Sequence, residues 1–242
     1  MKIENISFNH YINMLNQGVY YTFVRYGDGE WNAIRSIKKT LKKPCNCDKH
    51  QYFKGLGIKL KETLQKPIRD NQYFYGFQTL TDLTQRSDVI SFCDENMTGI
   101  QLHNADIFHI KNEAGELLPL IEALRKKHVC IVGPKWLRDL GQRYVFSPMG
   151  FIEIPEINCY LQAEQIKRKI LEYAKWSSEK DVVYAFSASM ATECMIYDLW
   201  PMLGKQNWLI DFGSLWDVYA GKYTRKYHSR ISKETINKNI NR

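Results

Sequence analysis

The stretch that decides the fold is YYTFVRYGDGEW, residues 20–31. Its first half is rich in aromatic and β-branched residues, which predicts a buried β-strand. The strand stops at a glycine turn, where Gly27 and Gly29 lack the Cβ atoms that would block a ligand. An amphipathic helix follows from Trp31. Because open α/β sheets bind ligands beyond the carboxyl ends of their strands, this turn lies where a site is expected.

The turn carries two carboxylates, Asp28 and Glu30, just after one cation, Arg25. Two carboxylates with one residue between them suit Mg²⁺ or Mn²⁺ that also contacts substrate phosphates. We therefore predict that Asp28 and Glu30 bind a metal and act in catalysis. Arg25 would bind a phosphate or, as we slightly prefer, steady the carboxylates. The alternative is that Asp28 only forms the turn and Glu30 only favours the helix start through the helix dipole.

The rest of the chain alternates strand and helix patterns without an internal repeat or a linker. Apolar, β-rich runs predict further strands at 73–77, 128–134, 151–155, 181–186 and 208–212. Amphipathic patterns predict helices at 7–17, 52–66, 117–124, 160–176 and from residue 190. This alternation indicates βαβ units. The predicted fold class is α/β and Rossmann-like, a single domain whose largely parallel sheet is flanked by helices.

Two later strand ends also carry polar residues. Ser187 and Ser189 follow the strand at 181–186, where small hydroxylated residues allow a nucleotide or sugar to approach closely. Asp211 and Asp217 follow the last strand, and we favour Asp217 over Asp211 as the acid that takes a proton from an acceptor hydroxyl. As alternatives, the serines cap a helix and the aspartates serve turns and caps.

The net charge of +8 is concentrated in two segments. Residues 35–69 hold eleven Lys or Arg against two acids, and residues 222–242 hold seven against one. This distribution favours a polyanionic partner, with a solvated lysine-rich surface as the alternative. We divide the chain into a catalytic domain, residues 1–221, and a basic C-terminal tail, residues 222–242. In the tail, Lys222 and Arg225 could close over a diphosphate or remain solvated.

The composition limits the cellular context. Six cysteines in 242 residues are too few for a disulfide framework, and several lie in apolar runs, so we expect reduced thiols. Cys45-Asn46-Cys47-Asp48-Lys49-His50 has no second ligand pair at a spacing suited to zinc, which favours a loop with a polar substrate contact. We expect no membrane span and a cytoplasmic protein, in a bacterial cell or a phage-infected host.

Two segments resemble a known family. RYGDGE at residues 25–30 resembles the N-terminal signature of GT-D-type glycosyltransferases, and LIDFGSLWD at 209–217 resembles the late strand and turn of that family. The order of the elements between them also fits. The resemblance implies a Rossmann-like domain, a nucleotide-sugar donor that is commonly UDP-glucose, and a Mn²⁺-type cation held with Asp28 and Glu30. It leaves the acceptor and the stereochemistry open.

The predicted function is therefore a metal-dependent glycosyltransferase that moves a hexose, with glucose favoured, from a UDP-sugar to a hydroxyl. Mn²⁺ or Mg²⁺ is the expected cofactor. The basic segments 35–69 and 222–242 narrowly favour DNA as acceptor, through a hydroxymethylated pyrimidine as in some phage DNA. One alternative is a glycan or glycoprotein acceptor. A second is a non-enzymatic nucleic-acid-binding module, which gives Asp28 and Glu30 no role.

Overall fold

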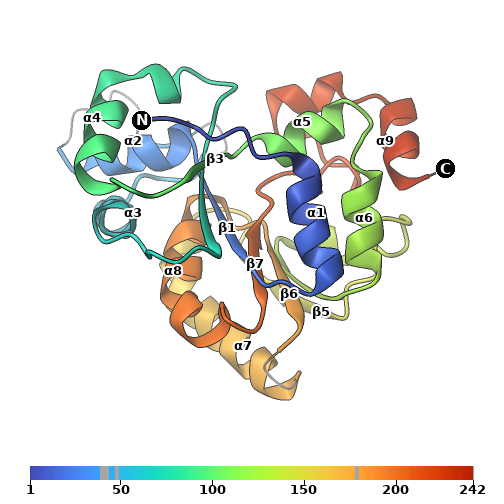
Figure 1. Ribbon diagram of the computed structural model, residues 1–242. Helices are drawn as coiled ribbons and strands as arrows, with labels where there is room; N and C mark the ends of the chain where they lie inside the picture. Colours follow the sequence, from blue (N-terminus) through green and yellow to red (C-terminus); the bar gives the residue numbers. More distant parts are fainter. Residues whose placement is uncertain (39–43, 47–48, 178–179, 242) are drawn as a thin grey trace.

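Seven parallel strands form one sheet in the order β3-β2-β1-β7-β6-β4-β5 (Figure 1). The structure, a computed structural model, describes residues 1–38, 44–46, 49–177 and 180–241. The strands are β1 (Thr22–Tyr26), β2 (Tyr73–Phe77), β3 (Leu102–Asn104), β4 (His128–Gly133), β5 (Gly150–Glu153), β6 (Val182–Phe186) and β7 (Trp208–Asp211). The predicted α/β fold with a parallel sheet is confirmed.

Helices cover both faces of this sheet (Figure 1). One face carries α2 (Asp28–Ser36), α3 (Lys54–Gln65), α4 (Ser87–Asn96), α7 (Ala163–Trp176) and α8 (Thr192–Leu203). The other face carries α1 (Phe8–Gln17), α5 (Ile107–Glu113), α6 (Leu118–Arg125) and α9 (Lys233–Ile240). A separate apolar core lies between the sheet and each helix layer. Among the described residues, no helix is long and apolar enough to cross a bilayer.

The direction of each crossover decides which face its helix covers. The chain moves along the sheet in one direction from β1 to β2, from β5 to β6 and from β6 to β7, and these connections cover the α8 face. It moves in the opposite direction from β3 to β4 and from β4 to β5, and these connections cover the α6 face. Parallel crossovers share one hand, so opposite directions must use opposite faces. The segment after β1 covers the α8 face and the segment after β7 covers the α6 face, so the chain leaves these neighbouring strands toward opposite faces. Open α/β sheets bind ligands at such switch points.

The strands that the sequence predicts are present, but β3 is an addition. Its three residues pair with β2 at the edge of the sheet. Such a short strand cannot show an alternating pattern, so sequence periodicity does not reveal it. After Gly133 the chain forms a five-residue 3₁₀ segment, η2 (Lys135–Asp139).

The basic segment at the C-terminus is folded, and its helix packs against α5 and α6. The sequence left its order open, and the structure forms η5 (Lys226–Arg230) and then α9, which begins after Ser232. The Ser232 hydroxyl accepts a hydrogen bond from the Thr235 amide at 3.0 Å and so caps the helix. The side chains of His228 and Asn239 are buried. This segment therefore forms part of the wall on the α6 face.

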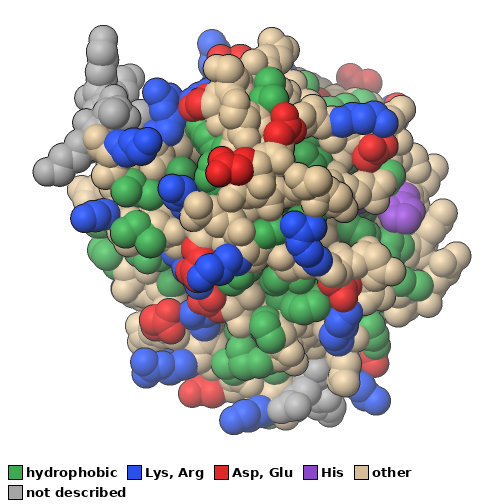
Figure 2. Space-filling view, turned by 60° about the vertical axis from the view of Figure 1, so that its left-hand side comes forward, with side chains coloured by type: hydrophobic (Ala, Val, Ile, Leu, Met, Phe, Trp, Pro, Cys, Tyr) green, Lys and Arg blue, Asp and Glu red, His purple; other side chains and the backbone are tan. Residues whose placement is uncertain are grey.

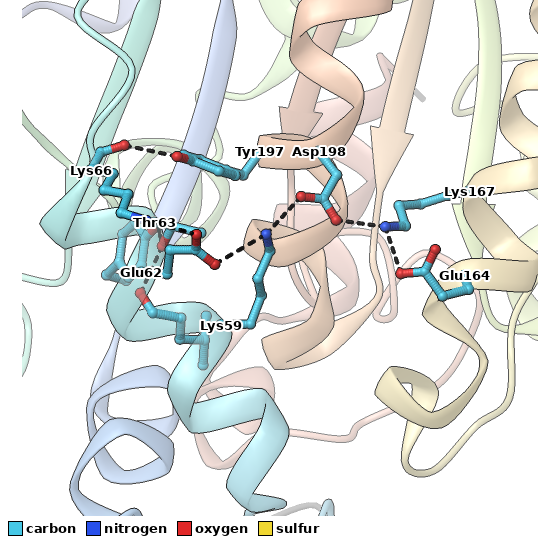
Figure 3. Close-up of polar contacts among 10 residues, drawn as sticks. Lys59, Glu62, Thr63, Lys66, Glu164, Lys167, Tyr197 and Asp198 are labelled. Carbon is cyan, nitrogen blue, oxygen red and sulfur yellow. Dashed lines mark hydrogen bonds and ion pairs between the residues drawn. The ribbon is translucent and has the colours of Figure 1, made fainter.

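An ion-pair network joins three helices of the other face (Figure 3). Asp198 of α8 lies between Lys59 of α3, at 2.8 Å, and Lys167 of α7. Glu62 of α3 lies 3.4 Å from both Lys59 and Lys66. Partly exposed ion pairs of this kind contribute roughly 0–1 kcal/mol each to stability. The apolar core therefore supplies most of the energy that holds these helices together.

Candidate functional site

Two adjoining cavities lie beyond the carboxyl ends of the strands. The first, which we call the carboxylate cavity, has a volume of about 570 Å³ and lies over β1, β2 and β7. The second, which we call the apolar cavity, has a volume of about 330 Å³ and lies over β4, β5 and β6. Ser189, Gly213, Ser214 and Arg225 border both. Two cavities therefore adjoin at the strand ends, where the site was expected.

The acidic pair belongs to the first turn of α2, and this corrects the predicted boundary. The helix begins at Asp28 instead of Trp31. Glu30 accepts a hydrogen bond from the buried Gly27 amide at 2.7 Å and so satisfies a backbone donor that the helix leaves free. Asp28, Glu30 and the two glycines line the carboxylate cavity. Glu30 thus has the capping role considered as an alternative and also faces the cavity.

Asp28 has an oxygen with no partner. Its Oδ1 is buried and accepts no hydrogen bond among the described residues. Burial raises the pKa of Asp28, and the nearby carboxylates of Asp82 and Asp106 raise it further, against the opposing effect of Arg86. A buried, unpaired carboxylate oxygen among like charges is unfavourable unless a cation or a donor joins it.

Arg25 holds the end of β7 in place. Its Nε donates to the Ala105 carbonyl at 2.8 Å, and its Nη1 lies 4.0 Å from Asp211 Oδ2. Asp211 Oδ1 accepts the Gly213 amide at 2.8 Å. The carboxylate that Arg25 contacts is thus Asp211, and its expected role of steadying Asp28 and Glu30 stays a prediction. Asp211 borders the carboxylate cavity together with Asp28 and Glu30.

Glu193, which the sequence did not reveal, is a buried neighbour of Asp211 and Glu30 and borders neither cavity. It is 1% exposed and follows β6 in the first turn of α8. Burial raises its pKa well above the ordinary value, and the charges of Asp211 and Glu30 add to the rise. The side chains of Glu193 and Asp211 interact, and this contact also raises the pKa of Glu193 while it lowers that of Asp211. Asp28 follows its strand by two residues, but Glu193 lies seven residues after β6, beyond the segment η4 (Ser189–Ala191), so the signal used for Asp28 does not reveal it.

His109 and Asp106 also line the carboxylate cavity and were missed. His109 is buried, and this burial lowers its pKa well below 6.5. The positive charge of the nearby Arg25 lowers the pKa further, which favours the neutral ring. Asp106 Oδ2 accepts the amides of Thr79 at 2.7 Å and Leu80 at 2.9 Å, which shapes the loop after β2. Both residues follow β3, the strand without a sequence signal.

The two predicted serines and Asp217 border the apolar cavity. Ser187 is 9% exposed, and its Oγ has no partner among the described residues. Ser189 has a φ of 53°, a left-handed conformation that is uncommon for a residue with a side chain. Asp217 accepts hydrogen bonds from Trp136 Nε1 at 3.0 Å and from the Thr224 hydroxyl at 2.6 Å. Burial raises the pKa of Asp217.

The C-terminal segment contributes cations unequally. Arg225 borders both cavities, whereas Lys222 borders neither and lies with its Nζ 5.9 Å from the Trp136 ring. Arg230 borders the carboxylate cavity and pairs with Glu113 at 2.9 Å. The structure therefore brings Arg225 to the site and leaves Lys222 outside it.

The Cys-Asn-Cys-Asp-Lys-His loop reaches both cavities. Asn46 borders the carboxylate cavity, and Lys49 and His50 border the apolar cavity. His50 Nδ1 accepts the Asn158 amide at 3.1 Å. Cys47 and Asp48 lie outside the described residues. The expected contact of this loop with a polar substrate stays a prediction.

The residues at the carboxylate cavity fit a hard divalent cation. Among the described residues, no group of three His, Cys, Asp or Glu is arranged as a complete metal site. Mg²⁺ and Mn²⁺ commonly use one or two protein carboxylates and complete their shell with water and substrate phosphates. The unpartnered oxygen of Asp28 beside Glu30 supplies such an incomplete set.

Comparison with known proteins identifies the fold. A glycosyltransferase (DUF1792) from Streptococcus sanguinis matches 90% of this chain and 84% of its own, with a TM-score of 0.63 and 16% identity. The chain has the fold of the DUF1792 glycosyltransferases. A structure described as a distinct glycosyltransferase fold of domain of unknown function 1792 matches 93% of this chain and 88% of its own, with a TM-score of 0.62 and 15% identity.

A selenomethionine structure of the same domain gives a TM-score of 0.62 at 16% identity, over 93% of this chain and 88% of that one. No protein-family model and no curated protein matches the sequence. The resemblance that residues 25–30 indicated is thus confirmed in three dimensions.

Proposed function

We propose that this protein is a metal-dependent glycosyltransferase that moves a hexose from a UDP-sugar to a hydroxyl acceptor. The observation that carries the proposal is the unpartnered, buried oxygen of Asp28 beside Glu30. It lies at the carboxyl ends of β1 and β7, on a fold shared with glycosyltransferases. The alternative function, a non-enzymatic nucleic-acid-binding module, gives the Asp28 and Glu30 carboxylates no role.

Asp28 and Glu30 would hold Mn²⁺ or Mg²⁺, and the donor diphosphate would complete the shell. When bound, the cation neutralises the negative charge that develops on the leaving diphosphate. Arg25 is engaged with Ala105 and Asp211, so its role is to position the carboxylates. Arg225, which borders both cavities, is the cation available to a phosphate.

For the acid that takes the acceptor proton, the geometry favours Asp211 over Asp217. Asp211 shares the carboxylate cavity with Asp28 and Glu30. Asp217 faces the neighbouring cavity instead. Both aspartates accept hydrogen bonds, so the cavity that each one borders decides the choice. This choice reverses the order of preference that the sequence suggested.

The activity is tested by incubating the protein with Mn²⁺ and a panel of nucleotide sugars and measuring hydrolysis and transfer. We expect Asp28→Ala and Glu30→Ala to abolish both reactions while circular dichroism shows an intact fold. Asp139→Ala, at an exposed acid outside both cavities, is the control and should keep full activity. Unchanged turnover of the donor in both Asp28 and Glu30 variants would refute the proposal.

Two basic segments, 35–69 and 222–242, favoured DNA as the acceptor, and the structure weakens the argument from the first. In the described part of segment 35–69, Lys59 and Lys66 pair with Asp198 and Glu62. The face shown in Figure 2 has Lys and Arg interspersed with Asp and Glu. Such a surface attracts a polyanion weakly. We therefore propose a carbohydrate hydroxyl as acceptor and keep a hydroxymethylated pyrimidine in DNA as the alternative.

Salt dependence separates these acceptors. If DNA is the acceptor, its affinity should fall steeply between low and moderate salt, because bound lysines and arginines release counterions. If the acceptor is a carbohydrate, the protein should not bind duplex or single-stranded DNA at low salt. Transfer to DNA that contains hydroxymethylcytosine would establish the alternative.

A further inference from the structure

We propose that the edge of the sheet opposite the two cavities docks on an anionic lipid bilayer. All seven strands run parallel, so their amino ends share this edge, and both cavities lie beyond the other edge. The docking surface, which we call the amino-end patch, combines exposed apolar side chains with exposed lysines. Its residues are Val19, Met149, Trp176, Lys126, Lys175 and Lys180.

The apolar part of the amino-end patch is centred on Trp176. All six tryptophans lie among the described residues, and five of them are buried or half-buried, whereas Trp176 is 74% exposed. It is the last residue of α7, whose end lies at the lower edge of the molecule in Figure 1. Met149, which precedes β5, is 66% exposed, and Val19, which lies shortly before β1, is 38% exposed. The fold therefore leaves these large side chains uncovered.

Met149 and Trp176 adjoin one another through Tyr173. The rings of Trp176 and Tyr173 lie 5.6 Å apart. The Tyr173 ring packs against the backbone of Gly150, where it occupies the space of a Cβ, and Met149 is the preceding residue. The Tyr173 hydroxyl lies 2.6 Å from His128 Nε2, which ties the end of α7 to the start of β4. Exposed apolar side chains that adjoin in this way mark an interaction surface.

A second set of contacts connects the turn before β4 to the start of β1. Lys127 Nζ lies 4.5 Å from the centroid of the Trp208 ring. Trp208 Nε1 donates a hydrogen bond to the Val19 carbonyl at 2.8 Å. The turn of Lys126 and Lys127 therefore joins Val19 to the surface around Trp176.

The same edge is strongly basic. The segments that lead into the seven strands hold eight Lys or Arg against three Asp or Glu. These segments are residues 17–21, 65–72, 97–101, 125–127, 146–149, 175–181 and 204–207. Lys126, Lys175 and Lys180 are exposed and form no ion pair with another described residue. An exposed cluster of unpaired cations attracts a polyanionic surface.

An anionic bilayer complements both the charge and the apolar side chains of the amino-end patch. Anionic headgroups attract lysines, and tryptophan is enriched at the boundary between headgroups and acyl chains, where its ring is covered and its Nε1 can still donate. Duplex DNA offers phosphates but no apolar layer for Met149 and Trp176. A second copy of the chain, related by a twofold axis, would bring the lysines of one patch against those of the other. The bilayer is therefore the partner that fits.

Docking through this edge leaves the candidate functional site free. The longest strand, β4, has six residues and spans about 20 Å between the two edges of the sheet. A molecule bound through the amino-end patch therefore keeps both cavities about that far from the lipid surface and open to solvent. The docking does not depend on the proposed function, because it uses none of the residues that border the cavities.

Co-sedimentation with lipid vesicles tests the docking. The wild type should bind vesicles of phosphatidylcholine mixed with phosphatidylglycerol at low salt, and should bind vesicles of pure phosphatidylcholine far more weakly. High salt should reduce the binding, because counterions screen the lysines. Absence of binding to the phosphatidylglycerol vesicles at low salt would overturn the proposal.

Variants at the amino-end patch locate the contact. Lys175→Ala combined with Lys180→Ala should weaken vesicle binding about twentyfold, since each lysine near an anionic surface contributes about fivefold. Trp176→Ala should weaken it about tenfold through lost apolar contact. Both variants change exposed side chains and should keep the wild-type fold and the wild-type hydrolysis of nucleotide sugars. Vesicle affinity equal to that of the wild type in both variants would contradict the docking.

Two control variants carry the same kinds of change elsewhere. Leu161→Ala removes a 66% exposed apolar side chain just before the opposite end of α7. Lys54→Ala combined with Lys233→Ala removes two exposed lysines at the starts of α3 and α9. None of these residues borders either cavity. Both controls should bind vesicles within about twofold of the wild type. Losses as large as those of the patch variants would show that the amino-end patch is not the contact.

Fluorescence quenching identifies the residue that meets the lipid. Phosphatidylglycerol with brominated acyl chains should quench the wild type, because Trp176 enters the bilayer boundary. Trp176→Phe should still bind these vesicles but lose most of the quenching, and equal quenching in the two proteins would overturn the proposal. A wild type that ignores vesicles, forms dimers in sedimentation velocity and becomes monomeric in Trp176→Ala would make the second copy the partner. Binding of duplex DNA through Lys175 and Lys180, without vesicle binding, would make the partner a nucleic acid.

Discussion

At the scale of single residues, Glu193 shows how the site tolerates several acids in a small volume. It is buried beside Asp211 and Glu30, and a third negative charge there would have no solvent to screen it. Burial and the neighbouring carboxylates raise its pKa, which favours the neutral form of Glu193 and so reduces the negative charge of the three acids.

Glu193→Gln should preserve this arrangement because its amide can donate a hydrogen bond to Asp211. We expect the free energy of unfolding to change by less than about 1 kcal/mol in urea denaturation at pH 7. Glu193→Ala leaves Asp211 without that donor and opens a cavity, so it should cost roughly 2–4 kcal/mol. Equal losses in the two variants would contradict a stabilising hydrogen bond from residue 193 to Asp211.

Buried histidines make the protein sensitive to acid. Burial lowers the pKa of His103 from 6.5 to about 4, and its Nδ1 lies 2.7 Å from the Tyr11 hydroxyl. The unfolded chain therefore takes up the proton first as the pH falls below 6.5. The free energy of unfolding should decrease from there to about pH 4, by on the order of 3 kcal/mol from this residue.

Urea denaturation at pH 7.0 and 4.5 measures this effect. His103→Gln should reduce the difference between the two pH values. His10→Gln should leave most of it, because His10 is an exposed residue of α1. An equal pH dependence in the wild type and His103→Gln would contradict the prediction.

At the scale of elements, the turn after β7 depends on a glycine. Gly213 has a φ of 53°, and a Cβ there would lie within 2.2 Å of Arg25 Nη1. Gly213→Ala should therefore displace Arg25 as well as strain the backbone. We expect a loss of at least about 2 kcal/mol in unfolding free energy, together with reduced sugar transfer.

Gly18 offers a matched control at the end of α1. Its φ is 73°, but a Cβ there would meet nothing within 4 Å. Gly18→Ala should cost only the backbone strain, about 1 kcal/mol, and leave transfer unchanged. If both variants lost activity equally, the contact with Arg25 would have no functional role.

The elements themselves were largely predictable. The buried strands β1, β2, β4, β6 and β7 are continuous apolar, β-rich runs, and burial on both faces of a parallel sheet requires such runs. The start of α2 was not predictable to the residue. Gly27 is a poor helix former, and the bond from its amide to Glu30 decides the boundary.

At the scale of the whole molecule, the C-terminal segment is part of the fold. The Asn239 side chain accepts the Leu117 amide at 2.8 Å and donates to the Asn112 carbonyl at 2.9 Å. These contacts join residues more than a hundred positions apart. They hold α9 against α5 and α6 and so fix the base of the segment that carries Arg225 and Arg230.

Asn239→Ala should destabilise the protein by roughly 2–3 kcal/mol, because it leaves buried backbone groups unpaired. Thermal unfolding followed by circular dichroism measures the loss. Asn237→Ala is the control on the same helix, at an exposed position, and should change stability by less than about 0.5 kcal/mol. If both variants unfolded at the wild-type temperature, the segment would contribute little to stability.

The sequence by itself determined the strands, the parallel α/β class and the acidic pair after the first strand. Buried strands and turns depend on residues that are close together in the sequence, so local patterns reveal them. Only the tertiary structure brought Asp106 and His109 to the carboxylate cavity and Glu193 to Asp211 and Glu30. Only it separated Asp217 from Asp211 into different cavities. The reason is the strand order. β1 and β7 are neighbours in the sheet, although all five remaining strands lie between them in the sequence. Contacts across such distances depend on the direction of each crossover, which no local pattern records.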